Sequence, residues 1–508
     1  MSIRMFQKIE RLILFGMIIG LPFMNLPKSF SIPYLGGNIS KWFLVIGVAI
    51  LIWEYIIFPF KIPSLAKKYF VIFTGWQILC LIIGLIEYEF PHYLRINELP
   101  SLYSILEKWQ SLRAIPDIVA VKFWLFLRYT KEILVVNCQH LIIAFFIWHL
   151  YNDNYTKAFE DFRKAGAILV GLLGFYSIFE LSWLKFGSRW GEAVLREINP
   201  HLYEIGHYNG WWPPILWNNG LRSLMEEPSL FGIVSVFLMP FLWTYIKSNK
   251  GENIGSWIVN NGYWLLFIGY FMVMLFATNS RTAVIIFICE LILLTVGTII
   301  AKTRNQFIRT MCVFVLATSA FCINLVNFQR TSGGESASSK VLTKQYINRT
   351  VTSVSEKGKY SNNARLANLI AHLNTLREYP FMGTGTGLID LYLDRNIPSF
   401  AYSNHEVRNW SRYLHMEGIF KSNFPALNKY MSVATQNGLV GFLLFLYPYF
   451  YIIHIIWELR KKIEIDDPLL TFFISGVALT LAGLSNSAYF SCIGYIFGGL
   501  FCLTEYYK

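Results

Sequence analysis

The stretch TNSRTAVIIFICELILL, residues 278–294, decides the fold class. Arg281 stands near its start, and the apolar side chains after it continue almost without charge. A bilayer's hydrocarbon core is crossed by about 20 apolar residues, which such a run approaches. The whole chain has the same character, since 55% of its 508 residues are hydrophobic and only 15% are charged. This composition predicts a membrane protein and excludes an ordinary soluble one.

Similar apolar runs recur about twelve times along the chain, each close to the length of one membrane-spanning helix. We therefore predict an all-α polytopic membrane protein with about 12 transmembrane helices and a large outer loop region. The last two runs are short and joined by GLSNS, so one long helix with a re-entrant segment is an alternative there. The predicted spans are 11–27, 40–58, 69–87, 131–150, 166–185, 228–247, 259–277, 281–300, 310–327, 433–457, 468–483 and 487–504.

Lys and Arg in the short loops predict the orientation, because basic loops are retained in the cytoplasm. The basic segments MSIRMFQKIER, KIPSLAKKY and ELRKK all fall on one side, and an even number of spans then places both termini in the cytoplasm. The loops at 88–130 and 186–227 fall on the opposite side. We expect residues 1–327 to hold nine spans, residues 328–432 to form a large, partly helical outer loop, and residues 433–508 to hold three spans.

Charge and cysteine content exclude several classes of protein. The net charge of +13 is divided among membrane-flanking loops instead of one basic domain, so no nucleic-acid partner is expected. All seven cysteines fall inside predicted spans, in neither a disulfide framework nor a zinc spacing. The absence of a Gly-rich phosphate loop on the cytoplasmic side disfavours an ATP-driven pump.

The outer loop contains NNARLANLIAHLNTLREYPFMGTGTG, residues 362–387. Its leucines recur at helical spacing, which predicts a helix with Asn363 as N-cap, Arg365 in the first turn and an end at Tyr379-Pro380. The GTGTG that follows permits tight turns, but it is a weak phosphate-binding signal because no strand precedes it.

Three motifs together resemble the O-antigen ligase and O-antigen polymerase superfamily. They are NSRTA at the start of a span, the outer-loop helix followed by GTGTG, and LNKYMSVATQNGLVGFLLFLYP at 427–448. The element LRSLMEEPSLFG at 221–232 adds the EPS triplet often seen in polymerases. Leu427 is a departure, since the family's HNxYL pattern has a histidine there.

The resemblance implies a membrane-embedded, GT-C-like inverting glycosyltransferase of the bacterial inner membrane, with its active site on the periplasmic face. Its substrate would be an undecaprenyl diphosphate-linked oligosaccharide in the membrane lipid, with no cofactor and no metal, and a polysaccharide chain-length regulator would be a partner. Without a metal ion, guanidinium groups must neutralise the departing diphosphate. The candidates are Arg281, Arg365 and Arg222.

Glycosyl transfer also needs a base to activate the acceptor hydroxyl. Glu226 and Glu227, at the outer entrance of the sixth span, are the candidate catalytic carboxylates, and His405 and His415 are alternatives. Trp211, Trp212 and Trp217 could stack on sugar faces or form an interfacial aromatic belt.

We predict an O-antigen polymerase that transfers the growing glycan from one undecaprenyl diphosphate carrier to an incoming carrier-linked repeat unit, as in lipopolysaccharide biosynthesis. One alternative is an O-antigen ligase that transfers polymer to lipid A core. Another class is a flippase for lipid-linked oligosaccharides, since twelve spans is an ordinary transporter count. Transporters, however, place more charge at mid-membrane depth than this chain does.

Overall fold

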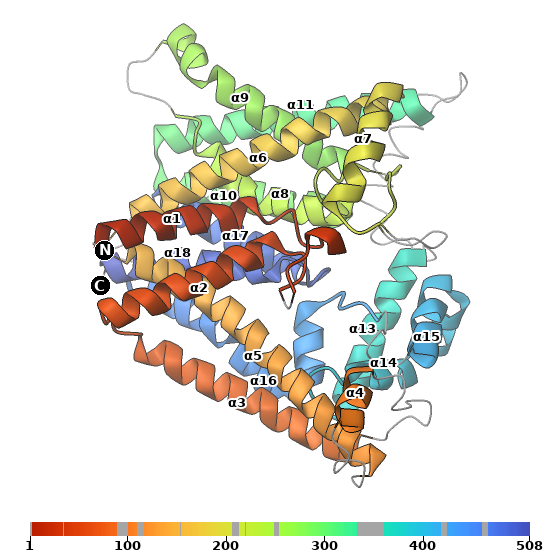
Figure 1. The fold of residues 1–508 in the computed structure, drawn as a ribbon. Helices are drawn as coiled ribbons and strands as arrows, with labels where there is room; N and C mark the ends of the chain where they lie inside the picture. The colour runs from red at the N-terminus through yellow and green to blue at the C-terminus, as the bar shows by residue number, and fades with distance from the viewer. Residues whose placement is uncertain are drawn as a thin grey trace.

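The structure is a computed structural model built almost entirely of α-helices (Figure 1). It describes residues 3–33, 35–88, 100–108, 116–152, 154–205, 213–218, 220–247, 253–332, 360–417, 424–459 and 466–507. Within these ranges the only β-type pairing is an isolated bridge between Ile32 and Gly36. The predicted all-α class is confirmed for the described residues.

The helices of the first part of the chain are α1 (Ile3–Ile19), α2 (Ile39–Ile57), α3 (Ser64–Glu87), α4 (Pro100–Lys108), α5 (Asp117–Tyr151), α6 (Tyr155–Phe186), α7 (Arg189–Leu202), α8 (Pro228–Trp243), α9 (Ile254–Ala277), α10 (Arg281–Ala301) and α11 (Arg304–Ser332). Those that follow are α13 (Tyr360–Glu378), α14 (Ile389–Arg395), α15 (His405–Glu417), α16 (Lys429–Leu459), α17 (Asp467–Ala482) and α18 (Ile493–Tyr507). Short 3₁₀ turns occur at η1 (Lys28–Phe30), η5 (Ser399–Ser403) and η6 (Phe490–Cys492).

Every predicted span overlaps one of these helices, so the hydrophobic pattern located the helices well. Eight helices of the described chain, α2, α3, α5, α6, α9, α10, α11 and α16, are long and apolar enough to cross a membrane. Helices α8 and α17 are apolar but shorter. The chain is therefore a multi-pass membrane protein, and the expected total of twelve spans stays a prediction.

Many helix starts are fixed by polar N-cap side chains, which accept a backbone N–H of the first turn. In α10, Ser280 accepts from the N–H of Ala283, and in α17, Asp466 accepts from the N–H of Leu469. Helix α8 instead begins with Pro228, which has no N–H to leave unpaired. Helix starts in a membrane protein require such partners, because lipid provides none. Other side-chain caps are Asn38, Asn154, Ser188 and Asn253.

Helix α8 forms the centre of the bundle. Almost all of its side chains are buried, and it packs against α6, α10 and α17. A helix that is apolar on all sides is expected where other helices surround it. Its central place explains how a helix of 16 residues can lie within a bundle of longer ones.

Two pairs of charged side chains link helices of this bundle. Arg309 on α11 donates to both carboxylate oxygens of Asp467 on α17, at 2.6 and 2.8 Å. Arg11 on α1 makes the same two-bond contact with Asp161 on α6, at 2.6 and 2.8 Å. A buried carboxylate is strongly destabilising without such a partner, so both pairs hold their helices in register.

Helices α13, α14 and α15 lie at the end of the bundle opposite both chain termini (Figure 1). They come from the predicted outer loop, which is helical in its described part, as expected. Helix α13 begins at Tyr360, so the prediction of Asn363 as N-cap was wrong and Asn363 lies inside the helix. Arg365 consequently lies in the second turn instead of the first. The predicted end is confirmed, since α13 stops at Glu378.

The turn after α13 is locked to a kink in α16. Gly438 adopts φ 65° and ψ −178°, which interrupts α16. The N–H of Leu439 donates to the carbonyl of Pro380 at 2.8 Å. The indole N–H of Trp76 on α3 satisfies the carbonyl of Asn437 at 2.9 Å. The backbone groups released by the kink are therefore paired, as membrane depth demands.

We predict that Gly438→Ala destabilises the protein by about 1–3 kcal/mol, because only glycine tolerates this backbone conformation. The added Cβ would also overlap the carbonyl oxygen of Phe381. The expected result is a lower melting temperature of the detergent-purified protein. Gly75→Ala on α3 is the matched control, since nothing lies near its added Cβ and alanine favours a helix. Equal melting temperatures for the two variants would contradict the role of the kink.

Candidate active site

Arg281 is presented by a tight turn between α9 and α10. Asn279 has a positive φ of 54°, and Ser280 caps the next helix. The turn makes Arg281 the first residue of α10, where its side chain is half-buried. Its Nη1 donates to Oδ1 of Asn362 on α13 at 2.9 Å. This contact between α10 and α13 was not predicted from the sequence.

Arg365 lies one helical turn beyond Asn362, on the same face of α13, because residues three apart are neighbours on a helix. The contact of Asn362 with Arg281 therefore brings the two predicted diphosphate-binding arginines to one region. Arg365 is exposed, and its Nη1 donates to the carbonyl of Ser485 at 3.1 Å. It also acts on Glu406 of α15, whose pKa burial raises and Arg365 lowers, with burial the larger effect.

The GTGTG sequence, residues 383–387, has a packing role. Its three glycines all have positive φ values, 69°, 88° and 82°. The N–H groups of Thr384 and Gly385 donate to carbonyls of α16, at Thr435 and Gln436, at 3.0 and 2.9 Å. Since these N–H groups already donate to α16, the turn joins the end of α13 to α16 and does not form a phosphate-binding loop.

A cavity of about 200 Å³ lies at the same end of the bundle. Lys41 of α2, His140 of α5 and Lys429 of α16 line it with the loop that follows α17. Polar Asn38 and Gln139 share the wall with apolar side chains, and none of the described lining residues is acidic. A cavity with this lining favours a ligand that combines an anionic group with apolar chain.

Lys429 gives this cavity an unusual feature, because it is the first residue of α16. A cation at a helix N-terminus is unfavourable with the helix dipole, and an anion there relieves the conflict. The carboxylate of Glu132 on α5 interacts electrostatically with Lys429. Within the described residues, the buried Nδ1 of His140 has no hydrogen-bond partner. An anionic ligand in the cavity would offset the charge of Lys429 at the helix N-terminus, and a ligand oxygen would pair with Nδ1 of His140.

The cavity is connected to the arginines through the loop between α17 and η6. Arg365 contacts this loop at Ser485, and residues 487–491 of the same loop line the cavity. A series of contacts, through Asn362, α13 and the loop after α17, therefore connects Arg281 and Arg365 to the cavity that Lys429 lines. Lys429, His140 and Lys41 were not predicted as site residues from the sequence. The lysine of LNKYM is the one sequence feature that points to this site.

Arg222 occupies a different environment. Its guanidinium is buried, donates to the carbonyls of Pro214 and Ile215 at 2.9 and 2.7 Å, and lies 4.6 Å from the ring centre of Tyr203. The backbone N–H of Arg222 donates to the carboxylate of Glu180 on α6 at 3.0 Å. In this arrangement Arg222 organises the 213–227 loop and does not present its donors to a diphosphate.

The two candidate catalytic glutamates differ. Glu227 is the residue before α8 and accepts a hydrogen bond from the Ser229 hydroxyl, which suits a structural role at the helix start. Glu226 is buried, and its Oε1 has no partner among the described residues. Burial raises the pKa of Glu226 to about 7, although a hydrogen bond from Asn25 opposes the shift. Glu226 also interacts electrostatically with Tyr489, a residue of the cavity wall.

The alternative bases lie away from the cavity lining. His405 contacts Asn409 on the exposed side of α15, and His415 pairs with Asp394 at 2.9 Å while its side chain stays 53% exposed. Leu427, at the family's histidine position, packs against a small apolar cluster that includes Trp410. Trp217 is half-buried, whereas Trp211 and Trp212 lie outside the described residues.

The family model described as O-antigen ligase matches residues 265–446 of the chain. Over these residues the chain is similar to that family. This stretch runs from α9 into α16 and includes Arg281, α13 and the glycine turn. The resemblance to the O-antigen ligase and polymerase superfamily, whose members are glycosyltransferase-like enzymes, is confirmed. No curated protein matches the chain.

We predict that the raised pKa of Glu226 makes stability depend on pH. A carboxyl with a folded pKa of about 7 and an ordinary value of 4.5 favours the folded state below pH 4.5. That contribution falls as the pH rises and is lost above pH 7. Melting temperatures measured from pH 4.5 to 8 should therefore fall less in Glu226→Gln than in the wild type.

The control for this measurement is Glu87→Gln, because Glu87 is exposed at the end of α3. Its pH profile should follow that of the wild type. If Glu226→Gln has the wild-type profile as well, the buried carboxyl does not carry the predicted linkage.

Proposed function

We propose that this protein is a polysaccharide polymerase of the O-antigen type. It transfers a growing glycan from one undecaprenyl diphosphate carrier to a carrier-linked repeat unit at the periplasmic face of the bacterial inner membrane. The observation that carries the proposal is the Arg281–Asn362 hydrogen bond inside the matched domain, because it brings two arginines to one end of the bundle. Both termini lie at the other end (Figure 1).

The physical requirement is a counter-charge for the leaving group. When the anomeric carbon–oxygen bond to the diphosphate breaks, negative charge collects on the phosphate oxygens close to the membrane boundary. Arg281 and Arg365 are suited to bind it, since a guanidinium stays charged and donates to two phosphate oxygens at once. Lys429 adds a third positive charge beside the cavity. These groups stabilise charge that develops in the transition state.

The acceptor hydroxyl must lose a proton as its oxygen bonds to the anomeric carbon. We assign this proton to Glu226, whose pKa of about 7 suits a base at neutral pH. Its carboxylate takes the proton, the new glycosidic bond forms with inversion, and undecaprenyl diphosphate leaves. Glu227 and Arg222 then serve the site indirectly, through the α8 start and the 213–227 loop.

The cavity favours a lipid-linked substrate. Its wall combines Lys41 and Lys429 with apolar side chains such as Met24 and Phe490. A diphosphate attached to a long isoprenoid needs both kinds of contact, because its head is anionic and its tail apolar. This lining supports a carrier lipid as substrate over a water-soluble sugar nucleotide.

Polymerase activity is favoured over ligase activity at one position. In the ligases of this family a histidine precedes the Asn–x–Tyr element, and here Leu427 takes its place and packs in an apolar cluster. An apolar side chain cannot accept a proton, so the reaction must use another base. A polymerase that relies on Glu226 is consistent with this substitution.

We predict that Arg281→Ala and Arg365→Ala each lower polymer formation by at least about 100-fold, the usual effect of removing a donor to a transition-state anion. Cells that depend on each variant should show single repeat units in place of a polysaccharide ladder. Arg377→Ala is the matched control, since Arg377 is an exposed arginine near the other end of α13. Normal ladders from both test variants would refute the assignment.

We predict that Lys429→Gln raises KM for a carrier-linked repeat unit more than it lowers kcat, because the cavity binds the lipid head group before and during transfer. The measurement is product sizing with purified protein and a carrier-linked repeat unit. Lys68→Gln on α3 is the control, since Lys68 is exposed and does not line the cavity. An unchanged KM for Lys429→Gln would remove the cavity from the substrate path.

A further inference from the structure

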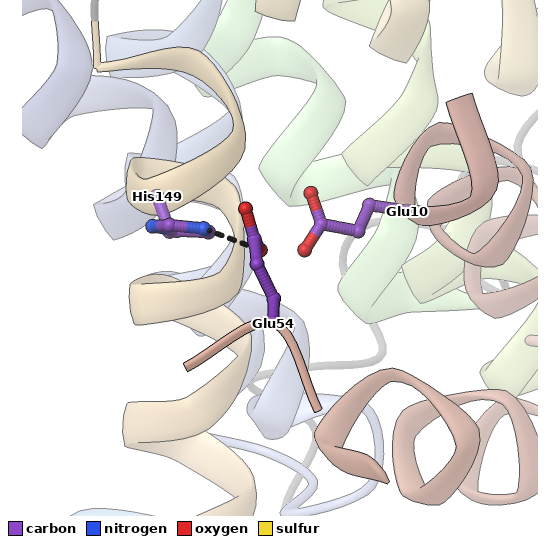
Figure 2. A group of neighbouring side chains, drawn as sticks. All are labelled: Glu10, Glu54 and His149. Atoms are coloured by element: carbon purple, nitrogen blue, oxygen red, sulfur yellow. Dashed lines mark hydrogen bonds and ion pairs between the residues drawn. The ribbon is translucent and has the colours of Figure 1, made fainter. Parts of the chain in front are cut away.

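Three side chains that could bind a metal meet at the far end of the bundle from the arginines. Glu10 of α1, Glu54 of α2 and His149 of α5 converge there (Figure 2). Glu10 and Glu54 are 1% and 5% exposed, so both carboxylates are withdrawn from water. Nothing in the proposed transferase chemistry uses them. The convergence of these groups from separate helices therefore calls for its own explanation.

The ligand atoms of the three residues are close enough to share one ion. One carboxylate oxygen of each glutamate and one imidazole nitrogen all lie within 4.8 Å of one another. His149 Nε2 is 2.9 Å from Glu54 Oε2. Ligands of one ion that are about 2.0–2.2 Å from it lie roughly 3–4 Å apart, so small side-chain movements complete the site.

Glu10 provides an independent sign of a missing ligand. Within the described residues, neither of its buried carboxylate oxygens has a hydrogen-bond partner. Figure 2 shows the Glu10 carboxylate directed toward Glu54. Two ionised carboxylates so close together in an apolar setting repel each other and are costly to bury unless they share a proton or a metal ion lies between them.

The histidine of the cluster is held in place by aromatic rings. The ring centres of Phe60 and Phe145 lie 4.2 and 6.0 Å from that of His149. This packing fixes the plane of the imidazole and aims Nε2 at the carboxylates. A ligand that is oriented before binding loses less conformational entropy when the ion arrives.

We propose that Glu10, Glu54 and His149 form a binding site for a divalent transition-metal ion of the Zn²⁺ or Mn²⁺ type. One imidazole nitrogen and two carboxylates suit these ions, and three protein ligands leave a position open for water. The ion neutralises the two carboxylates and links α1 to α2 and α5. The site is structural and independent of the proposed transferase function.

The metal site is separate from the cavity. His140 and His149 lie on the same helix nine residues apart, which corresponds to about 14 Å along its axis. Asn38, which lines the cavity, and Glu54 mark the two ends of α2. An ion held at Glu54 therefore does not touch a diphosphate in the cavity.

The test uses the full chain, purified in detergent through a tag without histidine and treated with a chelator. Zn²⁺ and Mn²⁺ are added separately, bound metal is measured by elemental analysis, and melting temperature is followed against metal concentration. The wild type should take up one equivalent of one of these ions and melt at a higher temperature as its concentration rises. Glu10→Gln and His149→Ala should bind it at least about tenfold more weakly.

Glu290→Gln is the matched control. Glu290 on α10 is also 1% exposed with both carboxylate oxygens unpartnered among the described residues, but it is not part of the cluster. Its variant should keep wild-type metal uptake. Two results would overturn the proposal: no uptake by the wild type, or equal uptake by Glu10→Gln. A higher melting temperature of Glu10→Gln without any metal response of the wild type would instead mean that the two carboxyls share a proton.

Discussion

The fold of the outer region depends on one set of backbone hydrogen bonds between the glycine turn 383–387 and the kink of α16. Because Gly438 has no Cβ, the backbone at Phe381 can pass close to α16, and the carbonyl of Pro380 accepts a hydrogen bond from the N–H of Leu439. This contact attaches the C-terminal end of α13 to a membrane helix. Because a helix is rigid, its other end is positioned as well, and that end carries Asn362 and Arg365. The meeting of Arg281 with the outer helix thus follows from a contact several turns away.

A second constraint concerns the polar groups that the bundle buries. Glu180, on a helix apolar enough to span a membrane, accepts the N–H groups of Arg222 and Ser223 at 3.0 and 2.7 Å. Arg222 in turn satisfies carbonyls of its own loop. Charged residues inside the protein therefore shape the loop before α8 and fix the position of Glu226. A charge in a span is commonly read as part of a transport path, but here its partners are backbone amides.

The sequence predicted helix positions well because a long apolar run has few alternatives in a bilayer. It also singled out Arg281 and Arg365 as candidates from motifs of a recognisable order, and the Arg281–Asn362 contact brings these two residues to one region. It could not show that Arg222 is enclosed by carbonyls, because those contacts depend on how the 213–227 loop folds. From the sequence, GTGTG could be a packing turn or an anion-binding loop. The hydrogen bonds that Thr384 and Gly385 donate to α16 identify it as a packing turn. The sequence could not show that one cavity is lined by Lys429, His140 and Lys41, because these residues come from three helices that are far apart in the chain.

The composition of the cavity wall has a consequence for biosynthesis. Asn38 and Lys41 are made early, whereas Tyr489 and Ser491 are among the last residues before α18. A nascent chain that has inserted its first helices, and even the complete family-matched domain, still lacks one side of the pocket. The wall of the cavity is therefore complete only late in translation, after α17 and η6 have been synthesised.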